Sequence, residues 1–309
     1  MSGTRDALSG RVAVVVPCLD EHATIRACIL SARRQEPPPA RIVVVDNGST
    51  DGSLAEAEAL ADHVVEDAGA TIGRLRNVGA LAAGACDILA FLDGDCTAEP
   101  GWLAAALGAL KDGDVVGART EAPSGGSWVA CRWAQVEARL ARTASYVGSA
   151  NMAVRRDVFE RVGGFDESLG TSEDVDLCER IVAAGGRVVL VPLMRVVHHG
   201  APANLKAFAR RQLWHASVPS WWWKASPRAR ALVAATLAWD GLGVAALFAG
   251  VVLASWWAAA GWTLTTLVAV LLLGALVGSG RHAPADGALL ALWAVTHAAR
   301  LRTGRRKRR

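Results

Sequence analysis

Short apolar runs alternate with longer stretches of helical periodicity up to about residue 200. Residues 12–16, 42–45 and 88–92 are nearly continuous apolar runs, which is typical of strands that are covered on both faces. Longer stretches with apolar residues at helical spacing follow them, at 23–34, 53–61 and 102–110. Strands and helices that alternate in this way predict βαβ units. We therefore expect an α/β fold with a mostly parallel central sheet.

The pattern changes after residue 200. Residues 201–230 predict an amphipathic, interfacial segment, and 231–279 contain two long apolar stretches, 232–254 and 263–277. Their lengths predict a C-terminal transmembrane helical hairpin, although helices in the core of a soluble domain would give the same pattern. Asp240 interrupts the first stretch, so it either contacts a lipid acceptor or shows that the span begins near residue 241.

Charge is concentrated at the C-terminus. The 309 residues carry a net charge of +4, but 300–309 hold seven basic residues and no acid. Such a tail after apolar segments favours binding to anionic membrane lipids, and we expect no nucleic-acid partner. We interpret 280–309 as an interfacial helix and a basic tail. The bias of positive charge predicts a multi-pass protein of the cell membrane, with the N-terminal domain and the C-terminus in the cytoplasm.

Asp93 and Asp95 form the strongest candidate for chemistry in the sequence. They follow the predicted strand 88–92, at the edge of the sheet where open α/β folds bind ligands. In extended backbone, residues two apart point the same way, so both carboxylates can face one divalent cation. Asp112 and Asp114 repeat the motif in a polar turn, and Asp174 and Asp176 repeat it in a helix. Only the first pair follows a buried strand.

Two further strands end in polar residues at the same predicted edge. The first strand ends in Pro17-Cys18-Leu19-Asp20-Glu21, and the second in Asp46-Asn47-Gly48-Ser49-Thr50-Asp51. Asp46 could accept hydrogen bonds from a nucleotide. Equally, the residues after each strand could serve only to form a tight turn into the next helix.

Together these motifs resemble glycosyltransferase family 2, whose members are inverting enzymes of GT-A nucleotide-sugar-binding fold. The opening 17–21 is similar to Pro-x-x-Asn-Glu, and 45–51 to Val-Asp-Asp-Gly-Ser-x-Asp, with Asp20 and Asn47 as departures. Residues 76–79 are similar to Arg-Asn-x-Gly and 91–95 to the Asp-x-Asp metal motif. The stretches 148–156 and 163–167 resemble the acceptor-side block, and Glu173-Asp174 the motif that supplies the base.

The resemblance implies a role for each matching residue. Donor binding would involve Pro17, Glu21, Asp46, Arg74, Arg76 and Asp93. Mg²⁺ or Mn²⁺ would be held by Asp93 and Asp95, with His198 as a further ligand, although the sequence cannot choose between His198 and His199. Asp174 would be the general base, and Glu173 would raise its pKa or orient the acceptor. The departures at Asp20 and Asn47 leave the preferred nucleotide open.

We therefore expect residues 1–200 to form a GT-A glycosyltransferase domain. It would move one sugar from a nucleotide-diphosphate sugar to a hydroxyl of a membrane-borne acceptor, a lipid-linked or envelope glycan. Residues 210–214 only partly resemble a motif of processive synthases, and a single predicted hairpin offers too few membrane helices for a polymer channel, so single transfer is preferred. Two alternatives remain. The acceptor could be polyprenyl phosphate, which needs no base, or the chain could be a degenerate nucleotide-sugar-binding scaffold at the membrane.

Overall fold

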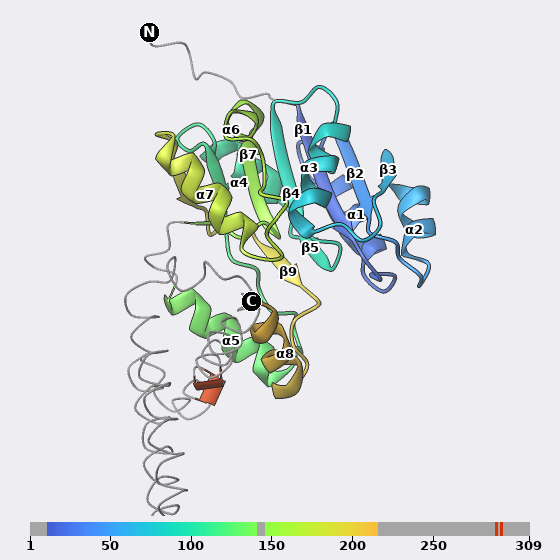
Figure 1. The fold of residues 1–309 in the computed structure, drawn as a ribbon, viewed down its shortest axis with the longest axis vertical. Helices are drawn as coiled ribbons and strands as arrows, with labels where there is room; N and C mark the ends of the chain where they lie inside the picture. The colour runs from blue at the N-terminus through green and yellow to red at the C-terminus, as the bar shows by residue number, and fades with distance from the viewer. Residues whose placement is uncertain (1–10, 141–145, 216–287, 290, 293–309) are drawn as a thin grey trace, which may run out of the picture. The chain divides into compact units, whose positions relative to one another are not determined.

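A computed structural model describes residues 11–140, 146–215, 288–289 and 291–292 (Figure 1). The chain divides into two compact units. The first comprises Met1–Gly125 and Thr143–Ala201, and the second comprises Gly126–Arg142 and Pro202–Arg309. All of the residues that the sequence analysis selects as site candidates belong to the first unit.

Strands and helices alternate through the first half of this unit, as the apolar pattern predicts. They are β1 (Val12–Cys18), α1 (Ile25–Arg33), β2 (Arg41–Asp46), α2 (Ser53–Leu60), β3 (His63–Glu66), α3 (Ile72–Ala82), β4 (Ile88–Leu92), β5 (Cys96–Ala98) and α4 (Trp102–Ala109). The second half contains β6 (Val115–Gly117), β7 (Asn151–Arg155), α6 (Arg156–Arg161), α7 (Glu173–Ala183), β8 (Val188–Leu190) and β9 (Val196–His198).

A seven-stranded sheet in the order β3-β2-β1-β4-β7-β6-β8 forms the centre of the unit. Strands β3, β2, β1 and β4 run parallel to one another, and β6 is parallel to β8. Only β7 is antiparallel to its neighbours. A separate antiparallel pair joins β5 to β9. The prediction of an α/β fold with a mostly parallel sheet is confirmed.

Alternate residues of β1 divide the core into two layers. Val14 and Val16 pack with buried residues of α1, α2 and α4 on one face of the sheet. Ala13 and Val15 pack with those of α3, α6 and α7 on the other face. Both faces are covered, which explains the nearly continuous apolar strands. Close packing of α3 depends on Gly79, since a Cβ there would overlap the side chain of Val15.

The second unit contains α5 (Trp128–Leu140) and α8 (Leu205–His215) among its described residues. The rings of Trp133 and Phe208 meet edge to face, with centroids 4.8 Å apart. Val129 and Leu289 complete this small cluster. Helix α8 was expected from the amphipathic pattern, whereas α5 was not predicted.

The predicted transmembrane hairpin is corrected by the structure. Over the described ranges, the chain forms no helix that combines the length and the apolar character needed to span a bilayer. The longest helix described after residue 200, α8, has 11 residues, far short of the roughly 20 required. The hairpin over 231–279 and the multi-pass membrane localisation derived from it are therefore not supported. Residues 231–279 themselves lie outside the described residues.

Candidate active site

Three of the predicted motifs meet at one edge of the sheet because their strands are neighbours. In the pairing of β1 with β2, Cys18 lies opposite Asp46. Strand β4 flanks β1 on its other side and leads directly into Asp93. The backbone N–H of Gly94 donates to the carbonyl of Pro17 at 3.3 Å. The residues after these three strands therefore surround one site, as the sequence analysis expected.

Asp95, Cys96 and His198 form a candidate metal centre. Strand β5 places Cys96 directly opposite His198 of β9, and Asp95 Oδ2 lies 3.5 Å from His198 Nε2. Ligand atoms of the three residues all lie within 4.8 Å of one another. Burial raises the pKa of the Cys96 thiol far above its ordinary value, which favours the carboxylate and the imidazole as ligands. These two ligand types suit a divalent cation such as Mn²⁺.

The two histidines of the pair differ in their surroundings. His198 is buried beside Asp95, whereas the ring of His199 is hydrogen-bonded to Thr97 Oγ1, with 3.0 Å between Nε2 and Oγ1. The space beside Asp95 also depends on Gly200, because a Cβ there would overlap Asp95 Oδ2. His198 is thus the histidine that faces the candidate metal centre.

Asp93 is bound by an arginine rather than grouped with Asp95 and His198. Its Oδ1 accepts a hydrogen bond from Arg76 Nη2 at 2.6 Å, while Nη1 of the same guanidinium donates to Glu173 Oε1, also at 2.6 Å. Arg76 is 2% exposed. Arg76 was expected at a donor diphosphate; the structure places it between two carboxylates, one from each side of the site.

Glu173 and Asp174 begin α7, where the backbone brings them to a common partner. The N–H of Ser149 donates to Asp174 Oδ2 at 3.2 Å, and its hydroxyl donates to Glu173 Oε1 at 3.1 Å. Burial, together with the negative charge of Glu173, raises the pKa of Asp174 well above its ordinary value. A carboxylate of this kind can accept a proton near neutral pH. Ser149 was not selected from the sequence, although it lies in the acceptor-side block 148–156.

Asp46 organises the turn that follows β2. Its Oδ2 accepts hydrogen bonds from the N–H groups of Gly48 and Ser49, both at 2.9 Å, and its Oδ1 accepts one from the Ser49 hydroxyl at 2.5 Å. Asp46 is 1% exposed. This is the turn-forming role that the sequence analysis left open beside nucleotide binding.

Glu21 lies near both acidic residues of the metal motif. Burial raises its pKa to about 7, with a further contribution from the charge of Asp95. The Cγ of Glu21 lies close above Gly94, where a Cβ would be 3.5 Å away from it. The side chain is thus placed beside the candidate metal centre, where an added positive charge would favour its ionised form.

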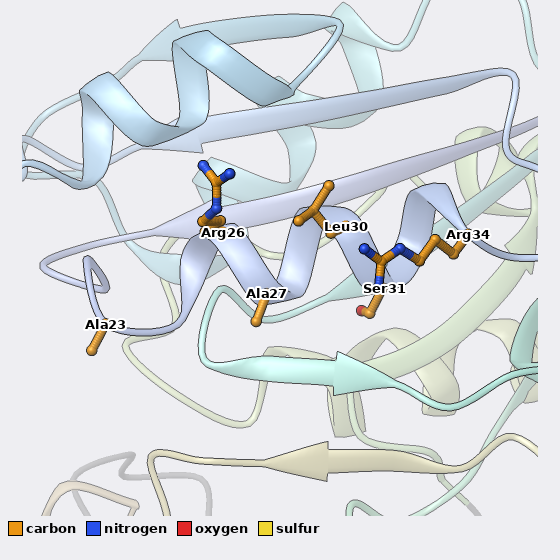
Figure 2. A pocket seen from close by; sticks show the side chains of 6 residues that line it. All are labelled: Ala23, Arg26, Ala27, Leu30, Ser31 and Arg34. Atoms are coloured by element: carbon orange, nitrogen blue, oxygen red, sulfur yellow. The ribbon is translucent and has the colours of Figure 1, made fainter.

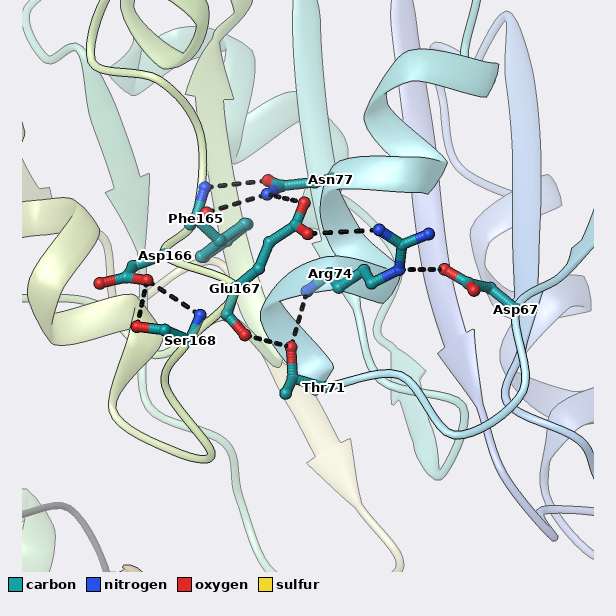
Figure 3. Close-up of polar contacts among 8 residues, drawn as sticks. All are labelled: Asp67, Thr71, Arg74, Asn77, Phe165, Asp166, Glu167 and Ser168. Atoms are coloured by element: carbon teal, nitrogen blue, oxygen red, sulfur yellow. Dashed lines mark hydrogen bonds and ion pairs between the residues drawn. The ribbon is translucent and has the colours of Figure 1, made fainter.

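Arg74 lies on α3 two residues before Arg76, and its contacts are with Asp67 and Glu167 (Figure 3). Its Nε donates to Asp67 at 2.8 Å, and Nη1 lies 3.4 Å from Glu167. The side chain is about half exposed. Arg74 thus ties the loop before α3 to the loop 163–170, and no described contact joins it to Asp93 or Asp95.

A pocket on the outer side of α1 lies apart from these contacts (Figure 2). It is lined by Ala23, Arg26, Ala27, Leu30, Ser31 and Arg34. None of these residues is a predicted site residue.

Two family models match the chain. Residues 13–163 match the model described as glycosyl transferase family 2, and residues 127–277 match glycosyl transferase family group 2. The first match contains the candidate metal motif and Arg76, and it ends before Glu173 and Asp174.

Two glycosyltransferases of Mycobacterium tuberculosis are similar to parts of this chain. The pre-mycofactocin glycosyltransferase of Mycobacterium tuberculosis is 34% identical over 60% of this chain and 42% of its own length. The N-acetylglucosaminyl-diphospho-decaprenol L-rhamnosyltransferase of the same species is 36% identical over 28% of this chain and 31% of its own. The chain thus spans less than half the length of these two relatives.

The solved structure of the mannosyltransferase PcManGT from Pyrobaculum calidifontis, in complex with GDP-Man and Mn²⁺, has a similar fold. The match has a TM-score of 0.57 at 20% identity, and it covers 93% of this chain and 87% of the mannosyltransferase chain. The family models, the relatives and the fold agree: residues 13–163 match a glycosyl transferase family 2 domain, and the chain has a GT-A-like fold.

Proposed function

We propose that the chain transfers one sugar from a nucleotide-diphosphate sugar to a hydroxyl of a lipid-linked or envelope glycan, with inversion. One observation carries this proposal. The metal motif and the base motif, far apart in sequence, are joined by the ion pairs from Asp93 through Arg76 to Glu173. Glycosyl transfer needs a donor site and a base close to one another, and these ion pairs support such an arrangement.

In the proposed reaction, Asp174 accepts the proton of the acceptor hydroxyl as its oxygen attacks the anomeric carbon. The bond from that carbon to the diphosphate oxygen breaks, and its electron pair leaves with the nucleoside diphosphate. Attack opposite the leaving group inverts the anomeric carbon. Asp95 and His198 would hold Mg²⁺ or Mn²⁺, which would stabilise the charge that develops on the diphosphate, while Asp93 stays paired with Arg76.

Two observations support a hydroxyl acceptor. The raised pKa of Asp174 suits a general base, which a phosphate acceptor would not need. The name of one relative also describes a sugar carried on decaprenol diphosphate. Binding of the tail 300–309 to anionic lipids is part of the proposal and rests on its charge alone, because the tail lies outside the described residues.

The test uses the full chain with a panel of nucleotide-diphosphate sugars, with Mn²⁺ or with chelator. Acceptors are a polyprenyl-diphosphate sugar and polyprenyl phosphate. We expect metal-dependent transfer to the first, and loss of turnover with donor binding retained in Asp174→Asn. Transfer to polyprenyl phosphate that persists in Asp174→Asn would support the phosphate alternative. Donor binding with neither transfer nor donor hydrolysis would support the scaffold.

A further inference from the structure

We infer that Arg76 is a positioning residue that sets the donor side of the site against the acceptor side. This inference rests on the proposed function. The guanidinium bridges Asp93, which follows β4, and Glu173, which begins α7. Both hydrogen bonds are 2.6 Å long, so each carboxylate is held at short range by the same rigid group.

The side chain of Arg76 is placed for this role and poorly placed to bind substrate. It is 2% exposed, and its guanidinium carbon lies 5.7 Å from the centroid of the Phe165 ring. Its Nε is buried and has no hydrogen-bond partner among the described residues. A substrate diphosphate would therefore have to displace one of the two carboxylates to reach the guanidinium.

Charge explains why an arginine is needed here. Glu173 is buried and lies beside Asp174, so two neighbouring carboxylates would repel each other without a cation. Arg76 lies against Glu173 and leaves Asp174 to the N–H of Ser149. Glu173 is thereby engaged by Arg76 and the Ser149 hydroxyl, and Asp174 is left as the proton acceptor.

The planar guanidinium of Arg76 also fixes the distance between Asp93 and Glu173. Nη1 and Nη2 are held in one plane, so Asp93 and Glu173 cannot move apart without loss of a charged hydrogen bond. A lysine would offer a single ammonium on a flexible stem. Replacement of a whole buried ion pair by apolar residues often changes stability little, so we attribute this pair to the geometry of the site. Loss of the fork should therefore affect the transfer step more than donor binding.

The experiment compares Arg76→Lys with Arg180→Lys in the full chain. Arg180 is a matched control, because it also ties α7 to another segment, through the carbonyls of Val162 and Gly164, and it pairs with Asp176 of its own helix. For Arg76→Lys we expect kcat to fall about 100-fold. The donor KM should change less than about threefold, and so should the rise in melting temperature that donor produces in the presence of Mn²⁺. Arg180→Lys should lower the melting temperature with kcat within about twofold.

A second variant, Glu173→Gln, keeps the test valid if Arg76→Lys folds poorly, because it breaks the same contact from the other side and should also lower kcat more than it changes the donor KM. A double-mutant cycle extends the test where both variants fold. Glu173→Gln retains the shape of Glu173 and removes its charge. We expect the effects of Arg76→Lys and Glu173→Gln on kcat to be strongly non-additive, because both act through the same contact.

Three results would overturn the inference. The first is an unchanged kcat in Arg76→Lys. The second is a raised donor KM with kcat preserved, which would make Arg76 a donor ligand. The third is additive effects of the two substitutions in the double-mutant cycle. Absence of transfer by the wild-type chain would instead reject the proposed function. The two failures can therefore be told apart.

Discussion

The side chain of Asn77 holds Phe165 through the backbone N–H and the backbone carbonyl of Phe165 (Figure 3). Its Oδ1 accepts a hydrogen bond from the N–H of Phe165 at 2.9 Å, and its Nδ2 donates to the Phe165 carbonyl at 2.9 Å. The Phe165 ring in turn packs on Phe91, with centroids 5.1 Å apart, and on Phe159. Arg76 and Asn77 are adjacent on α3, yet one serves the charged site and the other holds the loop that supports it.

Replacement of Asn77 by alanine should destabilise the domain. The change leaves the N–H and the carbonyl of Phe165 without their partner, and partly buried backbone groups that lose such bonds cost about 1–3 kcal/mol. The free energy of unfolding in urea measures the effect. Ser168→Ala is the control, since the Ser168 hydroxyl donates to nearby Asp166 in an exposed turn. Equal effects of the two variants would contradict this assignment.

Glu173→Gln should move the acid limb of the kcat profile to lower pH. Activity requires ionised Asp174, so the rate rises as pH passes through its pKa. That pKa is raised by burial and by the charge of Glu173, and removal of the charge lowers it. Glu179→Gln, an exposed position on the same helix, should leave the limb in place. A limb that stays fixed, or moves upward, in Glu173→Gln would argue against Asp174 as the base.

The adjacent histidines should respond differently to substitution. His198→Ala removes an imidazole from the candidate metal centre, so we expect Mn²⁺ affinity to fall by about tenfold or more. His199→Gln removes a ring that bonds to Thr97 and should leave Mn²⁺ affinity nearly unchanged. Titration of Mn²⁺ by electron paramagnetic resonance measures both without any need for turnover. The reverse order would show that His199 is the metal ligand.

Glu21→Gln should stabilise the metal-free protein at pH 8 but not at pH 4. The pKa of Glu21 is raised from 4.5 to about 7, so its protonated form is favoured in the native state. The associated stability is fully present below the unfolded pKa and is lost as pH rises through about 7. Melting temperatures in chelator over this pH range test the expectation. Glu58→Gln, an exposed change on α2, controls for the loss of one negative charge.

The order of strands and helices could be predicted because apolar periodicity is a local property of the chain. Strand β4 has the bounds Ile88–Leu92 in both the prediction and the structure. The short strands β5, β6 and β9 have three residues each and are defined by their partners, which local pattern does not reveal. Helix α5 was not predicted from the sequence.

The sequence by itself determined which residue types reach the sheet edge, since Pro17, Asp46 and Asp93 follow strands that the pattern already indicates. The tertiary structure decided which of these groups contact one another. Only folding brings Glu173 to Arg76, 97 residues away, and His198 to Asp95. Motif spacing suggested that Asp93 and Asp95 act as a pair, but burial of Arg76 divides them between a guanidinium and an imidazole. Charge compensation in a buried site depends on distances in space, and sequence spacing does not encode those distances.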